Sequence, residues 1–485
     1  MGIQNPKHKK ADPLHLGNGK WAAKVNKLLG YKIIHGRYFE KSFDFSRAST
    51  TTRVNKSGYI EDVAAHMPRI DYATSPEGAL LIEKASENAI TYPISFDNPY
   101  WTKNNASITS GHQSPKLGGS AFKLVEDTSN GEHSIVSPSD IPCPSNRKNA
   151  FSIYAKKGER KWIAFNHSFG TKDYSKCYAW FDLENGVWGE STKNPSSNYL
   201  HNLTSVSLAN GWYRISLTGV SGNIPYTGLP DVAEIRICSA ISDGDFSYQG
   251  DGTSGIYIAY AQLENSHDEP TALMIPTSEG TSASRVADSV GSFNLVQDFS
   301  YTGTQGVLFL DAEKYRGKNG HITLNDGDIN NQVKIHLQSH RTDNYCTVEY
   351  TSNGVTGWST YSSVIMDNRE RHKYAFRWRN GDWSLWIDGK EMAAQESSTT
   401  MMPFNTLTQL EFKLGGNYTI SEGNEFYGKI HSIKVADFLE DEEVAALTDT
   451  GKVEEEEGEE EEEASGGYYY YNGEPGFDGI GLVNL

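Results

Sequence analysis

Hydrophobic and polar residues alternate along most of this chain, in short runs separated by turn residues. Clear examples lie at 151–155, 212–217 and 233–238. A period of two places apolar side chains on one face of a strand and polar side chains on the other. Because Gly, Asn, Asp and Ser gather between the runs, the pattern is typical of antiparallel sandwiches. The sequence therefore predicts an all-β fold.

The alternating runs fall into two blocks, which predicts two antiparallel β-sandwich domains at 91–285 and 286–440. In the second block, Asn380-Gly381 and Asp388-Gly389 are hairpin signals separated by one short strand. A length of 485 residues allows two or three domains. The 46 glycines, 27 tyrosines and 10 tryptophans agree with a β protein that has many turns.

Residues 43–90 form a third region, which we predict to be a strand-rich junction. The segment Ala79–Ile82 is apolar at every position, so we expect a strand that is covered on both faces. Charged residues also gather in this region, and ion-pair networks commonly serve structure. We expect buried or half-buried pairs among five of them, which are Arg47, Arg53, Arg69, Asp71 and Glu83.

Residues 1–42 carry nine Lys or Arg residues against two acidic ones and are predicted to be a basic attachment arm. Trp21, Val25, Leu28 and Leu29 have the spacing of one helical face, which predicts a short helix from Trp21 to about Leu29. Two interpretations of this helix stay open: it packs on its own domain, or it docks the chain into a larger assembly. We do not expect it to bind nucleic acid or a membrane surface, because its arginines are few and its apolar face is short.

The acidity of the chain belongs to its last part, which we predict to be a tail at 441–485. From Glu440 to Leu485 there are 16 acidic residues against one lysine, a net of −15, which leaves −3 of the total −18 for the rest. A short acidic helix opens this part, and nine glutamates at 454–463 follow as a solvated linker. The Tyr- and Gly-rich end either docks on a partner or remains disordered.

No stretch of the sequence carries a catalytic, nucleotide-binding or metal-binding motif, so we expect no cofactor and no bound metal. The oxygen-rich stretch at 325–330 lacks the glutamate that a calcium loop of the EF-hand type requires, and we interpret it as a polar hairpin turn. We also expect no membrane span, no secretory signal and no enzymatic activity. The four cysteines, without any Cys-x-x-Cys pair, are predicted to be free and buried; they are Cys143, Cys177, Cys238 and Cys346.

Aromatic residues outside the predicted strands are the candidates for sugar binding, because an exposed ring offers an apolar face to a sugar. A tryptophan inside a strand, such as Trp212 or Trp378, is expected in the core instead. The candidates, all in segments that we predict to be loops, are Trp188, Tyr199, Trp358 and Tyr361.

Ordered motifs between Phe43 and Trp101 resemble a module common in bacteriophage structural proteins. They are S-R-A-S-x-x-x-R-V-N-x-x-G, then P-R-I-D-Y, then G-x-L-L-I-E, then N-A-I…S-F…W. Two departures are Asn88-Ala89-Ile90 in place of T-N-L, and Thr52-Arg53 in place of A-T. Segments such as SIYAKKG, GWYRISL and EPTALMIPTSEGTSASRVAD resemble the carbohydrate-binding jelly-roll of phage proteins, and RWRNGDWSLWIDGKE resembles concanavalin-A-like or laminin-G-like domains.

These resemblances imply a head- or tail-fibre protein of a bacteriophage virion that adheres to glycans. They imply a homo-oligomer, dimer or trimer, that contacts other virion proteins through the N-terminal arm and the C-terminal tail. Three alternatives stay open: a capsular polysaccharide depolymerase, a virion scaffold without ligand, and a secreted host lectin. The depolymerase is disfavoured because no parallel β-helix period is present. The secreted lectin is disfavoured because neither a secretory signal nor paired thiols are expected.

Overall fold

The computed structural model confirms the predicted all-β class. The structure describes residues 14–17, 21–34, 37–144, 147–169, 176–190, 200–220, 232–294, 305–315, 320–328, 330–337, 346–361, 370–379, 381–396, 407, 409–412, 425–436 and 438–451. These residues form antiparallel sheets and one α-helix, α1 (Asp441–Thr448). That helix is the short acidic one that the sequence predicts; Glu440 and Glu443 form a capping box at its start. No helix of the described residues is long and apolar enough to cross a membrane.

The first sandwich packs two antiparallel sheets around an apolar core. Alternate residues of each strand point inward, among them Phe151, Phe165 and Ile215, which are completely buried. One sheet has the order β11-β12-β24-β15-β20-β19 with β9 and β25 at the side, and the other has the order β10-β13-β22-β16-β17-β18 with β14, β21 and β23. The strands of the first are β9 (Ser86–Asn88), β11 (Ala106–Gln113), β12 (Ser120–Glu126), β15 (Lys148–Lys157), β19 (Leu200–Ser207), β20 (Trp212–Val220), β24 (Gly255–Asn265) and β25 (Ala283–Arg285). Those of the second are β10 (Thr102–Asn104), β13 (Asn130–Val136), β14 (Ile141–Pro142), β16 (Trp162–Phe169), β17 (Lys176–Asp182), β18 (Val187–Trp188), β21 (Val232–Glu234), β22 (Arg236–Ala240) and β23 (Ser247–Gln249).

The second sandwich has a long sheet of order β26-β4-β3-β1-β37-β28-β33-β34-β35 that packs on a sheet of order β27-β36-β29-β30-β31-β32. Trp378 and Trp212 are 0% and 1% exposed, which confirms that these strand tryptophans belong to the cores. The strands of the long sheet are β1 (Leu14–Gly17), β2 (Ala22–Lys24), β3 (Lys27–Ile34), β4 (Arg37–Ser46), β7 (Arg69–Asp71), β8 (Ala79–Ile82), β26 (Ser289–Val290), β28 (Gly306–Lys314), β33 (His372–Arg379), β34 (Asp382–Ile387), β35 (Lys390–Glu396) and β37 (Gly428–Ala436). Those of the other sheet are β27 (Phe293–Asn294), β29 (Gly320–Asn325), β30 (Gln332–Leu337), β31 (Cys346–Ser352), β32 (Val355–Tyr361) and β36 (Gln409–Glu411).

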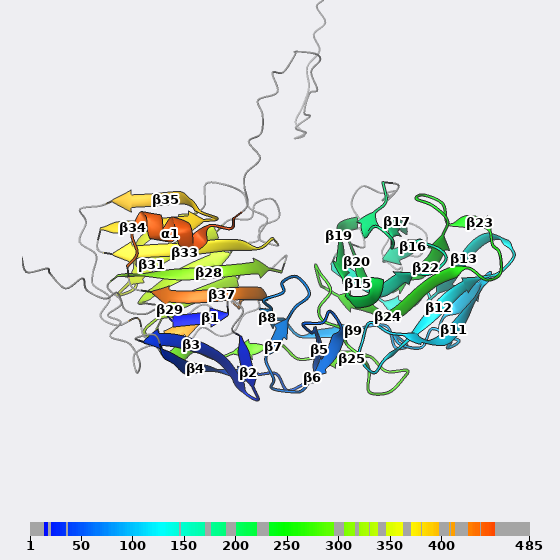
Figure 1. Ribbon diagram of the computed structural model, residues 1–485, viewed down its shortest axis with the longest axis horizontal. Coiled ribbons are helices and arrows are strands. Elements are labelled where there is room, and N and C mark those ends of the chain that lie inside the picture. Colours follow the sequence, from blue (N-terminus) through cyan, green and yellow to red (C-terminus); the bar gives the residue numbers. More distant parts are fainter. Residues whose placement is uncertain are drawn as a thin grey trace, which may run out of the picture. The chain divides into compact units, whose positions relative to one another are not determined.

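The N-terminal segment forms strands of this long sheet, so the predicted helix from Trp21 to about Leu29 is wrong. β1 pairs on one side with β3 and on the other with β37, where Leu14 faces Val435 and Leu16 faces Ile433. Figure 1 shows β1, in dark blue, between β3 and the orange β37. The four apolar residues with helical spacing do not share one buried face: Val25 lies in an exposed turn, whereas Leu28 is buried in a strand. Hydrogen bonds of β3 with β1 and β4, which a lone helix would lack, favour the extended form.

The junction contributes the short hairpin of β5 (Thr51–Val54) and β6 (Ile60–Val63), and it joins the long sheet through β8. All four residues of Ala79–Ile82 are buried, which confirms the prediction of a strand covered on both faces. The expected charge pairing is confirmed for Arg69, whose Nη1 donates to Oε2 of Glu83 at 2.6 Å. Arg69 and Arg47 share a further buried partner, Asp288, which lies far along the chain.

Two smaller sequence predictions are also confirmed where the structure describes them. Cys143, Cys238 and Cys346 are buried and are not part of disulfides, while the side chain of Cys177 lies outside the described set. The described residues of this stretch, 325–328 and 330, form a polar connection from β29 to β30, in which the Gly327 N–H donates to Oδ1 of Asn325 at 2.8 Å. No group of His, Cys, Asp and Glu side chains that fits a metal ion occurs among the described residues.

Candidate functional site

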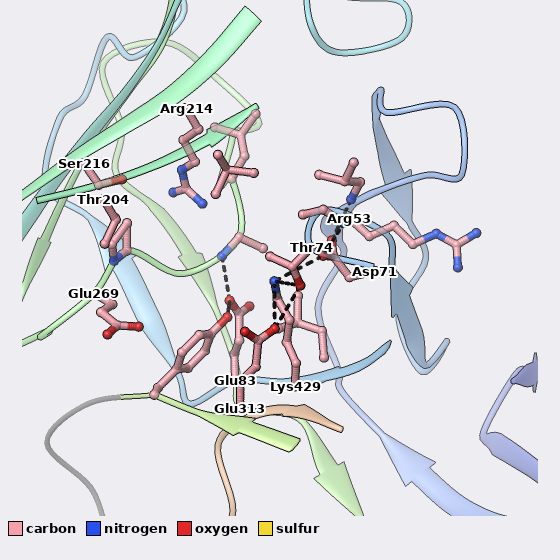
Figure 2. Close-up of a pocket in the computed structure, with 18 of the residues that line it drawn as sticks. Arg53, Asp71, Thr74, Glu83, Thr204, Arg214, Ser216, Glu269, Glu313 and Lys429 are labelled. Carbon is pink, nitrogen blue, oxygen red and sulfur yellow. Dashed lines mark hydrogen bonds and ion pairs between the residues drawn. The ribbon is translucent and has the colours of Figure 1, made fainter. Parts of the chain in front are cut away.

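A cavity of about 530 Å³ is the main candidate site of the described residues. Three parts of the chain line it: the junction, strands β19 and β20 of the first sandwich, and strands β28 and β37 of the second. Figure 2 shows Thr204, Arg214 and Ser216 on one side, across from Glu83, Glu313 and Lys429.

The first wall is the outer face of β20 and its neighbours. Ile215 points into the sandwich core, so Arg214 and Ser216 point to the opposite face, toward the cavity. The Arg214 guanidinium lies 5.5 Å from the centre of the Tyr154 ring. Its Nη2 donates to Oγ of Ser152 at 2.9 Å and to the carbonyl oxygen of Thr271 at 2.6 Å. These contacts fix the guanidinium in place at the wall.

The opposite wall is a paired network between the junction and the second sandwich. Lys429 Nζ lies 3.4 Å from Oε1 of Glu313 and donates to Oγ1 of Thr74 at 3.0 Å. Thr74 in turn donates to Glu313 at 2.9 Å. Burial alone raises the pKa of Glu313, but the nearby His431 imidazole, 3.6 Å away, and the charge of Lys429 outweigh it and lower the pKa to about 2. Glu313 is therefore ionised at neutral pH.

Glu83 forms part of the cavity lining and is 1% exposed. Its Oε1 accepts from the Ala272 N–H at 2.8 Å and from the Tyr315 hydroxyl at 3.2 Å. Burial raises the pKa of Glu83, but the charges of Arg69 and Arg285 outweigh burial and lower it to about 2. This carboxylate is thus also held as an anion.

The cavity therefore combines hydroxyl groups, ionised carboxylates and cations, with apolar patches between them. Such a mixture suits a ligand with many hydroxyl groups, because each hydroxyl both donates and accepts. It does not suit Glu83 or Glu313 as a general acid, since a general acid must hold its proton near neutral pH. Lys314 also lines the cavity; burial lowers its pKa to about 8, and its Nζ donates to the Tyr315 carbonyl oxygen at 2.8 Å.

Of the four aromatic residues predicted for sugar binding, the structure describes the side chain of Trp188, which does not line this cavity. Trp188 forms β18 and is half-buried, with its ring edge-on to Phe181 at 5.2 Å. Trp358 and Tyr361 lie in β32, so the prediction that these three residues occupy loops is wrong; the side chains of Trp358 and Tyr361 lie outside the described set. Tyr199 lies outside the described residues altogether. A role of these four residues in sugar binding stays a prediction.

The residues of the cavity were not identified from the sequence. The sequence offers one indication of Arg214 as a site residue, because it is a charged residue at an outer position of a strongly alternating strand. The sequence offers no such indication for Glu313, Lys429 and Thr74. Their proximity depends on the pairing of β37 with β8 and β28.

Comparison with known proteins finds structural neighbours of the carbohydrate-binding-module and laminin-G types. The CBM40 of a Ruminococcus gnavus IT-sialidase is 14% identical over 30% of this chain and 84% of its own, with a TM-score of 0.26. The CBM22-1-CBM22-2 tandem domain of Paenibacillus barcinonensis Xyn10C is 10% identical over 74% and 99%, with a TM-score of 0.23. Domains LG4-5 of the mouse laminin alpha1 chain are 11% identical over 67% and 92%, with a TM-score of 0.22.

No protein-family model and no curated protein sequence matches the chain. TM-scores this low give no basis for a statement about function. The functional proposal therefore rests on the cavity itself.

Proposed function

We propose that this chain binds glycans in the cavity, without cleaving them, as a head- or tail-fibre component of a bacteriophage virion. The observation that carries the binding proposal is the cavity, in which hydroxyl groups and ionised side chains face one open space of about 530 Å³. The virion proposal rests on the ordered motifs between Phe43 and Trp101.

The size and place of the cavity support a small-molecule site. Ligand pockets commonly measure about 300–1,000 Å³ and often lie where domains meet. Weak binding at each cavity suffices for adhesion, because many copies on one particle act through effective concentration.

Blocking the cavity is expected to abolish glycan binding. Thr204 is a half-buried cavity residue on β19, an edge strand, so a larger side chain there fills the cavity without entering the core. We expect Thr204→Trp to lower the affinity for any bound glycan more than ~10-fold, measured by glycan array and then by calorimetry. Thr204→Asn is the control, because its side chain is similar in size to threonine and polar.

Equal glycan binding by Thr204→Trp and the unchanged chain would contradict the cavity as the site. In that case Trp188, Tyr199, Trp358 and Tyr361 become the next residues to replace. Silence of the unchanged chain on every glycan would instead favour a scaffold without ligand.

Binding without cleavage is supported by the ionised state of Glu83 and Glu313, whose pKa values are both lowered to about 2. A hydrolytic depolymerase requires a protonated carboxyl group at the scissile bond, which neither residue supplies at neutral pH. Incubation with capsular polysaccharide discriminates the two functions: a depolymerase releases reducing ends or unsaturated products, and a binding protein releases neither.

The virion assignment predicts that antibodies against this chain label phage particles. Immunogold labelling is expected to place gold at the head or at the tail, and the particle's symmetry at that place then distinguishes a dimer from a trimer. Particles without label, from a culture that produces the protein, would contradict the assignment and leave the glycan proposal standing.

A further inference from the structure

Arg214 differs from Arg53, Lys429 and Glu83 of the same cavity because it has no counter-ion among the described residues. Arg53 pairs with Glu61 at 2.8 Å, Lys429 lies beside Glu313, and Glu83 pairs with Arg69. Arg214 instead contacts a hydroxyl, a carbonyl oxygen and an aromatic ring, and it forms no ion pair with a carboxylate of the described residues.

The guanidinium of Arg214 also has N–H donors that the described residues do not use. Its Nη2 makes both hydrogen bonds, its Nε is buried, and its Nη1 makes no hydrogen bond with the described residues. A guanidinium presents five N–H donors in a planar fork that matches the two oxygens of a carboxylate. Because the Tyr154 ring and the two acceptors already hold the fork in place, a ligand would not have to order it.

The carboxylates that line the cavity do not provide this missing anion. Glu83 and Glu313 are paired with other cations. Asp71 accepts from the backbone N–H groups of Val54 and Ala73. Glu269 and Glu370 also line the cavity, and neither forms an ion pair with Arg214 among the described residues.

We propose that the cavity takes an acidic saccharide, whose carboxylate binds the Arg214 guanidinium while the hydroxyls of Thr204 and Ser216 contact the sugar ring. This inference rests on the proposed glycan binding and names its ligand class. The register supports the geometry: Thr204 faces Ser216 across β19 and β20, and Arg214 lies two residues from Ser216 on the same face.

The test uses the full chain on an array of uronate- and sialate-bearing glycans, each printed beside its carboxyl methyl ester. We expect binding to the free acids at least ~10-fold tighter than to the esters, since a hydrogen bond to a charged group contributes that much. Arg214→Gln is expected to remove this preference, and Arg214→Lys to keep part of it. Arg147→Gln, an exposed arginine of the same sandwich outside the cavity, is the control.

A second pair of variants tests the same inference with Arg214 unchanged, so the test does not depend on the folding of the Arg214 variants. Val206 faces Arg214 across β19 and β20 and lines the cavity, so Val206→Asp places a carboxylate beside the guanidinium and should abolish the preference for acids. Val206→Asn differs from it by charge alone and should keep that preference. Equal binding of acids and esters by the unchanged chain overturns this inference but not glycan binding. If the unchanged chain binds no glycan on the array, both this inference and the glycan-binding proposal are overturned.

Discussion

Deletion of residues 1–20 is expected to lower the free energy of unfolding of the second sandwich by more than ~4 kcal/mol. The deletion removes β1, which is hydrogen-bonded to β3 on one side and to β37 on the other. It also removes Leu16, which is completely buried in the core of this sandwich. The strands β2, β3 and β4 then lose their connection to β37, and two strand edges are exposed.

Chemical denaturation followed by tryptophan fluorescence measures this effect. Leu16→Ala should cost about 2–5 kcal/mol by itself, because it leaves a cavity in the core. Val25→Ala is the control; Val25 is 57% exposed in the turn between β2 and β3, and its loss should change stability little. An unchanged unfolding transition after the deletion would mean that the segment is a separate arm, as the sequence suggested.

Arg69→Ala is expected to cost about 3–5 kcal/mol of stability, because it leaves buried carboxylates without their main cation. Arg69 is completely buried and binds both Glu83 and Asp288. Arg53→Ala is the matched control: the Arg53–Glu61 pair is more than a quarter exposed on each side, and its loss should cost at most about 1 kcal/mol.

The same variant should change the pH dependence of unfolding. The pKa of Glu83 is lowered from 4.5 to about 2 in the folded chain, so its stabilising contribution is complete above pH 4.5 and is lost as the pH falls toward 2. In Arg69→Ala this carboxylate loses its principal cation, and the loss of stability below pH 4.5 should be smaller. If the unfolding free energy of Arg69→Ala depends on pH as it does in the unchanged chain, Arg285 alone is sufficient to lower the pKa of Glu83.

Local features of the fold were predictable, since they depend on neighbouring residues. The alternation at 151–155, the fully apolar Ala79–Ile82 strand and the acidic helix at Asp441–Thr448 each follow from side-chain period or capping. The pairing of Arg69 with Glu83 was also predictable, because both residues lie in one short segment.

Features that depend on distant segments were not predictable. Nothing near Leu14 indicates that its strand pairs with Val435, and a chance helical spacing from Trp21 to Leu29 pointed to another structure. Asp288 completes the charge cluster of the junction from more than 200 residues away. The cavity likewise joins side chains from the junction and both sandwiches, so no single stretch of sequence carries its pattern.

The place of β1 in the long sheet has a consequence for the synthesis of the protein. Val435 lies 421 residues after its partner Leu14, so at about 5–20 residues per second the ribosome makes β37 roughly 20–80 s after β1. Until then β1 lacks its neighbour on that side, although the first sandwich, whose strands lie between, can form before β37 is made. Nascent chains are therefore expected to expose an unpaired strand edge for most of translation, a state that invites chaperone binding or premature association between neighbouring chains.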